Sequence, residues 1–161
     1  MPDTAYLSLG SNLGSREAQL RTAIKHLKSL GLVVVSSFYE TEPVEVTDQP
    51  WFLNCAIALQ TTKGPSELMS ELLNLERTMG RLRTHPKGPR TIDIDLLLFD
   101  DLIIDTPELT VPHPAMKERR FVLEPLAEIA PDARHPMLKK TVSELLRDLP
   151  EGQIVRKVKA E

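Results

Sequence analysis

Residues 88–100, with the sequence GPRTIDIDLLLFD, alternate apolar and acidic side chains before a continuous apolar run. Side chains along a β-strand point to opposite faces in turn. One face of this segment therefore carries apolar residues that we expect in a core, namely Ile92, Ile94, Leu96 and Leu98. Asp93 and Asp95 emerge together on the other face. The stretch predicts a strand that buries one side and displays a pair of carboxylates on the other.

Further strand-like and helix-like segments alternate on both sides of this stretch. Alternating apolar residues predict strands, and apolar residues spaced three or four apart predict helices. The other expected strands span residues 4–9, 32–39, 51–60 and 102–104, with an edge strand at 153–158, and the expected helices span 15–30, 66–79 and a segment ending near 149. The order βαββαβ predicts a ferredoxin-like α+β core, a mainly antiparallel sheet with two helices on one face and with loops and C-terminal helices on the other.

Single residues predict where several of these elements begin and end. Gly31 suits the left-handed residue that follows a helix. Ser66 can cap the next helix. Pro125 fits the first turn of a new segment better than the middle of a helix. Thr141 and Glu144 have the spacing of a capping box at the start of the last helix.

The composition suits one soluble domain spanning residues 1–161. With 161 residues and 41% hydrophobic content, the chain can bury a core without disulfides. A net charge of −3 gives no general attraction for nucleic acid or an anionic membrane. The single cysteine, Cys55, is expected in the core, and the sequence has no signal-like or membrane-spanning run. We expect a cytoplasmic monomer that binds neither nucleic acid nor membrane.

Asp93 and Asp95 have two interpretations. A solvent-exposed polar face is the simpler one for an isolated Asp-x-Asp pattern. The alternative is a metal platform, because two carboxylates on alternate strand residues, roughly 6–7 Å apart, repel each other unless a cation lies between them. Mg²⁺ binds through one or two carboxylates and leaves its other positions to water and phosphate oxygens. A metal held in this way requires a polyphosphate partner.

Residues 80–90, with the sequence GRLRTHPKGPR, supply cations directly before these aspartates. A charged surface loop would have the same composition. Arg81, Arg83 and Arg90, however, each offer a planar fork that matches phosphate oxygens. With its glycines and prolines, the segment predicts a mobile lid that brings arginines onto the phosphates of a nucleotide. His113, which lies between two prolines, is a further candidate donor to a phosphate, and a structural role in its turn is the alternative.

Six collinear motifs resemble the 6-hydroxymethyl-7,8-dihydropterin pyrophosphokinases of folate biosynthesis. They are LGSNLG, SSFYETEP, DQPWFLNCA, LLNLERTMGRLR, GPRTIDIDLLLFD and VPHPAMKERRFVLEPLAEIAPD, and they run from about residue 4 to residue 132. The last two are highly specific. The resemblance implies that the β,γ-diphosphate of ATP, the co-substrate, is transferred to the hydroxymethyl group of the pterin and that AMP is released.

The resemblance also implies roles for individual residues. Asp93 and Asp95 match the ligands of two Mg²⁺ ions, and with Arg81 and Arg83 they are the expected catalytic residues. The expected ATP contacts are Glu76, Arg81, Arg83, Arg90, Leu96, Thr110, His113 and Arg119. The expected pterin contacts are Thr41, Val44, Phe52, Asn54 and Phe121. Phe52 and Asn54 share a strand face, so a flat ring stacked on Phe52 would have the amide of Asn54 at its rim.

The chain departs from the family pattern at two positions. Lys87 stands where a tryptophan is common, so a stacking or closing role of that tryptophan is in doubt. Glu42 occupies a position that is often proline, so the rim of the pterin loop is expected to move differently. Two other classes remain open: a metal-dependent phosphohydrolase, which would give ADP without pterin, and a non-catalytic ferredoxin-like module, which would not bind Mg·ATP.

Overall fold

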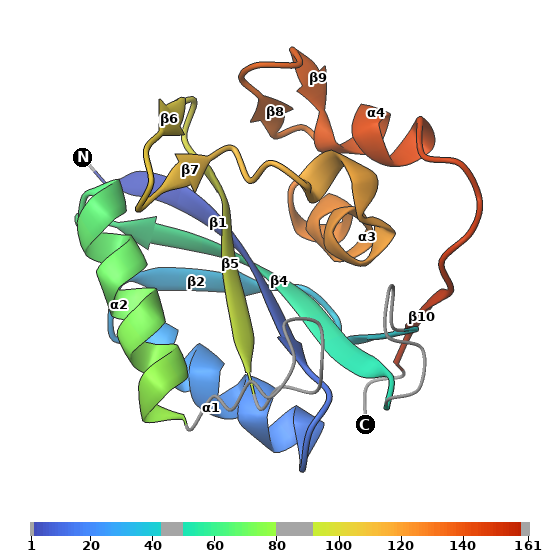
Figure 1. Cartoon of the computed structure of the whole chain (residues 1–161), viewed down its shortest axis with the longest axis horizontal. Helices are drawn as coiled ribbons and strands as arrows, with labels where there is room; N and C mark the ends of the chain where they lie inside the picture. The colour runs from blue at the N-terminus through green and yellow to red at the C-terminus, as the bar shows by residue number, and fades with distance from the viewer. Residues whose placement is uncertain (1, 43–49, 80–91, 159–161) are drawn as a thin grey trace.

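The computed structural model describes residues 2–42, 50–79 and 92–158, which form a six-stranded sheet with helices on both faces (Figure 1). The first part of the chain forms β1 (Asp3–Ser11), α1 (Arg16–Lys28), β2 (Leu32–Val35), β3 (Tyr39–Thr41), β4 (Phe52–Thr61), α2 (Pro65–Thr78) and β5 (Asp93–Phe99). The second part forms β6 (Ile104–Asp105), β7 (Thr110–Val111), the 3₁₀ helix η1 (Met116–Glu118), α3 (Arg120–Ile129), β8 (Arg134–His135), β9 (Lys140–Thr141), α4 (Val142–Arg147) and β10 (Val155–Lys157).

Strand β1 lies inside the sheet, between β4 and β5. The paired order is β10-β3-β4-β1-β5, and β2 also pairs with β4. The described pairings in this sheet are all antiparallel. This arrangement, with helices on both faces, confirms the predicted ferredoxin-like α+β class. The C-terminal strand β10 lies at an edge of the sheet, as expected.

Different helices cover the two faces of the sheet (Figure 1). Helices α1 and α2 pack on one face through a cluster that includes Leu27 and Leu68, and α3 and α4 pack on the other through a cluster that includes Leu123. Strand β4 contributes to both clusters, with Ala56 in the second. Its residues in the first cluster are Leu53, Cys55, Ile57 and Leu59. The burial of Cys55 in this cluster confirms its predicted packing role, and it raises the pKa of the thiol to about 12.

Strand β5 differs from the prediction at its second half. The register with β1 shifts, since Tyr6 pairs with Leu98 but Leu7 pairs with Leu96. Leu97 is therefore an extra residue, as in a β-bulge, and alternation restarts after it. Leu98 packs in the same cluster as Leu97, under α3, and not with Ile94 and Leu96 as expected. The bulge leaves the aspartates and the first apolar residues of the strand on their predicted faces.

Gly31 has a different role from the one predicted. Gly14 is the described glycine with a positive φ, and Gly31 does not adopt that conformation. A Cβ at Gly31 would lie only 1.8 Å from the carbonyl oxygen of Gln60. This glycine therefore lets the chain pass close to β4. The predicted strand 32–39 is split between β2 and β3, because the Ser36 side chain accepts a hydrogen bond from the Ala56 N–H (2.8 Å) where a regular strand would offer a carbonyl.

The proline and cap predictions were partly wrong. Helix α2 begins one residue earlier than expected, with Pro65 in its first turn and Gly64, not Ser66, as its N-cap. Pro125 lies inside α3 and is buried, because the packing of this helix on the sheet outweighs the one backbone hydrogen bond that a proline removes. The short strand expected at 102–104 forms instead at β6. The capping box of Thr141 and Glu144 is confirmed.

Candidate active site

Asp93 and Asp95 lie at the start of β5 on the face of the sheet that faces α3. Both side chains are partly buried. Among the described residues, Nε2 of His113 lies 3.9 Å from Oδ1 of Asp95, and Nη1 of Arg119 lies 3.9 Å from its Oδ2. Both separations are too long for a direct hydrogen bond, and the contact with Arg119 is an ion pair. The fold therefore brings together the acid pair and two of the predicted phosphate contacts from a later part of the chain.

His113 is held in place by two backbone interactions. Its N–H donates to the carbonyl of Leu97 on β5 (2.9 Å), and its Nδ1 accepts from the N–H of Ala115 (3.1 Å). In a neutral imidazole the proton then lies on Nε2, the atom nearest Asp95. Burial and the neighbouring Arg119 lower the pKa of His113 although Asp93 opposes them. The ring thus presents a neutral N–H donor to the site at physiological pH.

Arg119 and Phe121 occupy the start of α3. Arg119 is the N-cap residue of this helix, and its guanidinium carbon lies 5.5 Å from the centre of the Phe121 ring. This is a cation–π distance. The guanidinium of Arg119 therefore contacts both the ring of Phe121 and the carboxylate of Asp95. A predicted pterin contact and a predicted phosphate contact are therefore direct neighbours.

Asn54 is fixed by hydrogen bonds on the same face of the sheet. Its Oδ1 accepts from the hydroxyl of Thr41 (2.6 Å), and its Nδ2 lies 3.4 Å from the carbonyl oxygen of Leu9. Asn54 and Thr41 are buried, whereas Phe52 is partly exposed. Each amide group of Asn54 can still take part in one more hydrogen bond. Phe52 and Asn54 therefore offer a flat apolar surface next to an oriented amide.

Gly10 joins the two halves of this surface. It pairs with Asn54 on one side and with Asp93 on the other. Two strand spacings thus separate the amide residue from the first aspartate, roughly 10 Å across the sheet. A Cβ on Gly10 would come within 2.6 Å of Nδ2 of Asn54, so the amide leans into the space that this glycine leaves open. Sequence reasoning missed this residue, although a glycine at the end of a strand signals a close approach.

The remaining predicted contacts lie in three different environments. Thr110 is partly exposed on β7. Leu96 is 2% exposed, and its side chain packs in the cluster under α1 and α2, on the opposite face from Asp95. Glu76 is buried on α2, and its Oε2 accepts a hydrogen bond from the N–H of Ile94. The predicted residues Val44, Arg81, Arg83 and Arg90 lie outside the described residues, as does Lys87.

Asp93 and Asp95 suit a hard divalent cation. Within residues 2–42, 50–79 and 92–158, groups of three or more histidine, cysteine or acidic side chains that could hold a metal are absent. Two partly buried carboxylates supply oxygen ligands but do not complete a cage. That donor set fits Mg²⁺, which keeps positions for water and for phosphate oxygens. A triphosphate would supply the ligands that the chain does not.

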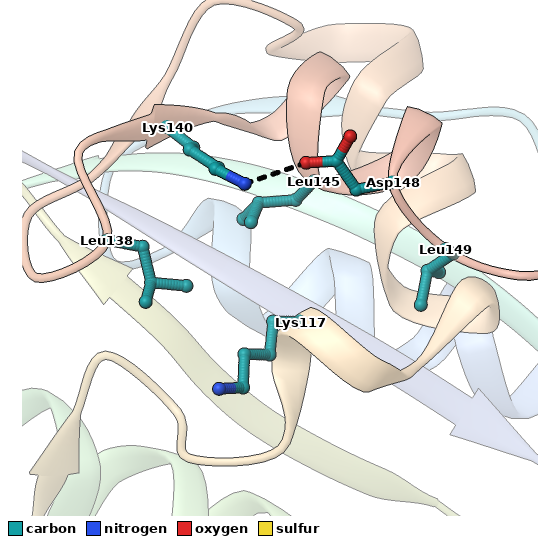
Figure 2. A pocket seen from close by; sticks show the side chains of 6 residues that line it. All are labelled: Lys117, Leu138, Lys140, Leu145, Asp148 and Leu149. Carbon is teal, nitrogen blue, oxygen red and sulfur yellow. Dashed lines mark hydrogen bonds and ion pairs between the residues drawn. The ribbon is translucent and has the colours of Figure 1, made fainter.

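A pocket of about 260 Å³ lies elsewhere, against η1, β9 and α4 (Figure 2). It is lined by Lys117, Leu138, Lys140, Leu145, Asp148 and Leu149. Nζ of Lys140 is paired with Oδ2 of Asp148 at 2.8 Å, so part of its charge is already compensated. None of the predicted site residues lines this pocket. The candidate active site is the face of the sheet around Asp93, Asp95, Gly10 and Asn54, where the strand register aligns predicted site residues.

A comparison with protein families decides which family this arrangement represents. The profile described as 7,8-dihydro-6-hydroxymethylpterin-pyrophosphokinase (HPPK) matches residues 6–131. The chain belongs to the HPPK family. A pyrophosphokinase transfers a diphosphate group, so this is a family of transferase enzymes.

The helices of the described residues lack an apolar stretch of the length that a membrane span requires.

Several named relatives resemble most of the chain. The 2-amino-4-hydroxy-6-hydroxymethyldihydropteridine pyrophosphokinase of Bacillus subtilis is 48% identical over 80% of this chain and 79% of its own length. The protein of that name from Haemophilus influenzae is 38% identical over 95% of this chain and 97% of its own length. The folic acid synthesis protein fol1 of Schizosaccharomyces pombe is 41% identical over 93% of this chain. The match spans only 21% of that longer protein.

The fold also resembles solved structures. The HPPK-DHPS of Plasmodium falciparum, in a crystal structure with pteroate, superposes with a TM-score of 0.72 and 18% sequence identity. The match covers 91% of this chain and 42% of the Plasmodium chain. At this identity the likeness shows a shared fold. It agrees with the family assignment, which rests on sequence.

Proposed function

We propose that the protein transfers the β,γ-diphosphate of ATP to the hydroxymethyl group of 6-hydroxymethyl-7,8-dihydropterin, with release of AMP, as a step of folate biosynthesis. The observation that carries the proposal is the row Asn54, Gly10 and Asp93 across three neighbouring strands. It would set a heterocycle-binding amide and a metal-binding carboxylate on one face of the sheet. The membership of the HPPK family supports the same reaction.

Asp93 and Asp95 would hold two Mg²⁺ ions. When bound, Mg²⁺ would neutralise charge on the phosphates and lower the pKa of the pterin hydroxyl. Arg119 and His113, which approach Asp95 from one side, would bind phosphate oxygens as donors. This arrangement needs no covalent intermediate on the protein, because phosphoryl-type transfer depends mainly on alignment and on compensation of charge.

The pterin would stack between Phe52 and Phe121, with the amide of Asn54 at its edge. Thr41 would orient that amide through the hydrogen bond to Oδ1. Val44 would complete this pocket, as the resemblance to the family implies. The hydroxymethyl oxygen would then attack the β-phosphorus of ATP in line with the departing AMP. Burial of the ring between two aromatic side chains would also keep water from the reacting oxygen.

The remaining ATP contacts are proposed from the resemblance to the family. The arginines among residues 80–90 would compensate charge on the phosphates, with Arg81 and Arg83 acting in the catalytic step and Arg90 in binding. Thr110 and the backbone of Leu96 would flank the adenine. Glu76, whose carboxyl group is buried against the N–H of Ile94, would act on the nucleotide side through β5 and not by touching ATP. We further propose that residues 1–161 act as one cytoplasmic domain and as a monomer, and that neither nucleic acid nor a membrane is a partner.

The proposal is tested by incubating the protein with Mg·ATP and 6-hydroxymethyl-7,8-dihydropterin. AMP and the pterin diphosphate should form in equal amounts, and chelation of Mg²⁺ should stop both. Formation of ADP in the absence of pterin would instead indicate a phosphohydrolase. Absence of both Mg·ATP binding and turnover would indicate a non-catalytic module.

A further inference from the structure

Glu76 is an acidic residue in a buried position of α2. The other buried positions of this helix are Leu68, Leu72 and Leu75, and Glu76 is only 3% exposed. Acidic side chains are rarely buried to this degree, because loss of hydration destabilises them unless hydrogen bonds compensate. A leucine would satisfy the packing of the helix alone. The carboxyl group therefore requires an explanation beyond the core.

The described hydrogen bond of Glu76 reaches the backbone between the two aspartates. Its Oε2 accepts from the N–H of Ile94 at 2.7 Å, at the short end for an N–H···O bond. Ile94 lies on β5, which ends the paired order in the described part of the sheet. A strand at this place has backbone groups without a strand partner on its outer side. Glu76 takes the place of a strand neighbour for one of them.

A second contact holds the same side of β5 two residues beyond Asp95. The N–H of His113 donates to the carbonyl oxygen of Leu97 at 2.9 Å. On its inner side the strand pairs with β1, with Asp95 opposite Ser8 and Asp93 opposite Gly10. The backbone that carries both aspartates is therefore held from both sides. Of the outer contacts, the one from Glu76 lies directly between Asp93 and Asp95.

We propose that Glu76 is a positioning residue for the metal-binding pair, which fixes the spacing and direction of Asp93 and Asp95 through the N–H of Ile94. The inference rests on the proposed function, since it requires these aspartates to hold Mg²⁺. Groups that hold metal ligands in place typically change metal affinity 10–100-fold when they are replaced. In this role the metal affinity depends on whether an oxygen of residue 76 reaches the N–H of Ile94, and not on the negative charge of that oxygen.

Two conservative variants separate reach from charge. Glu76→Gln keeps an acceptor oxygen at the same distance and removes the charge. Glu76→Asp keeps the charge and withdraws the oxygen by about 1.5 Å, one carbon–carbon bond. The measurement is the affinity for Mn²⁺, followed by electron paramagnetic resonance in the presence of α,β-methylene ATP. We expect Glu76→Gln to bind Mn²⁺ within about threefold of the wild type and Glu76→Asp to bind it at least about tenfold more weakly.

The controls exclude a general loss of structure and a direct contact with nucleotide. Glu71→Gln, an exposed position on the same helix, should change neither Mn²⁺ affinity nor melting temperature. AMP without metal should bind both Glu76 variants as it binds the wild type. Full Mn²⁺ affinity in Glu76→Asp, loss of it in Glu76→Gln, or a change in AMP affinity would overturn the inference. If wild-type protein bound Mn²⁺ no better than Asp95→Ala, the proposed function would fail and the inference with it.

Discussion

A backbone carbonyl decides which way the amide of Asn54 faces. The carbonyl of Leu9 can only accept, so it takes the Nδ2 side of the amide, above Gly10, while Oδ1 accepts from the hydroxyl of Thr41. The orientation of an amide follows from such a network, because oxygen and nitrogen have nearly the same shape. The edge that Asn54 can offer to a ligand is therefore set by the backbone of β1, with Thr41 completing the network.

Gly10→Ala should weaken binding of the pterin. The new methyl group would lie 2.6 Å from Nδ2 of Asn54, so the amide would have to move. We expect the KM for the pterin to rise about tenfold, as for the loss of about 1.4 kcal/mol of binding, with the KM for ATP nearly unchanged. Gly152→Ala is the matched control, because nothing lies within 4 Å of a Cβ at that position. Equal effects of the two variants would contradict the assignment of Gly10 to the site.

Asp95→Ala should abolish turnover. The change removes a proposed metal ligand and also the carboxylate that faces His113 and Arg119. AMP formation should fall to the background rate at every Mg²⁺ concentration tested. Asp101→Ala, an exposed aspartate in the turn after the same strand, should retain activity. Normal turnover by the Asp95 variant would exclude a metal platform at this position.

Helix α3 carries site residues at one end and is anchored at the other. Near its C-terminal end, Glu128 accepts hydrogen bonds from the hydroxyl of Tyr39 (2.6 Å) and from the N–H and hydroxyl of Ser37 (2.9 and 3.0 Å). These contacts tie the helix to β3 and to the segment before it. Arg119 and Phe121, at the start of the helix, thereby keep a fixed place over β5 and β4.

Glu128→Gln should lower stability in a pH-dependent way. Burial raises the pKa of Glu128, but the bonds from Tyr39 and Ser37 and the nearby Lys157 outweigh it and hold the pKa below its ordinary value of 4.5. A carboxyl group with a lowered pKa stabilises the fold fully at pH values above its unfolded-state pKa. This contribution to stability is lost as the pH falls through its folded-state pKa. Urea unfolding should show a loss of about 1–2 kcal/mol at neutral pH.

The difference in the free energy of unfolding between Glu128→Gln and the wild type should shrink when the pH falls below 4.5, the ordinary pKa of a glutamate. Glu108→Gln, an exposed glutamate between β6 and β7, should show no such dependence. A destabilisation by Glu128→Gln that stayed constant from neutral to acidic pH would mean that the ionised form of Glu128 does not stabilise the fold.

One sheet separates two hydrophobic cores and joins them into a single structure. Strand β4 contributes Leu53, Cys55, Ile57 and Leu59 to the cluster under α1 and α2 and Ala56 to the cluster under α3 and α4. Strand β5 also contributes to both clusters, with Ile94, Leu96 and Phe99 in the first and Leu97 and Leu98 in the second. Since neither core can form without these strands, we expect the domain to unfold in one cooperative transition.

Leu27→Ala and Leu123→Ala test this cooperativity from opposite faces. Both leucines are fully buried, one in each cluster. Each change should reduce the free energy of unfolding by about 2–5 kcal/mol and leave a single urea transition. Leu32→Ala, at a position that is 75% exposed, should change it by less than about 0.5 kcal/mol. A second transition in either core variant would show that the two faces unfold independently.

Local chemistry accounts for the predictions that succeeded. The alternation at the start of β5 predicted that Ile94 and Leu96 enter the core and that Asp93 and Asp95 lie on the opposite face. The spacing of leucines predicted α2, and the pair of Thr141 and Glu144 predicted a capping box. Each of these signals depends on residues a few positions apart in one helix or strand. The regular backbone geometry of that element fixes where their side chains lie relative to one another.

Contacts between distant segments decided what the sequence alone left open. The bulge at Leu97, the burial of Pro125 and the close approach at Gly31 arise where one element packs against another, so packing outweighs local preference. The same holds for the site, where β1, β4 and β5 align Asn54, Gly10 and Asp93 and where His113 reaches Asp95. A sequence lists these residues far apart, and only the register of the strands brings them onto one face.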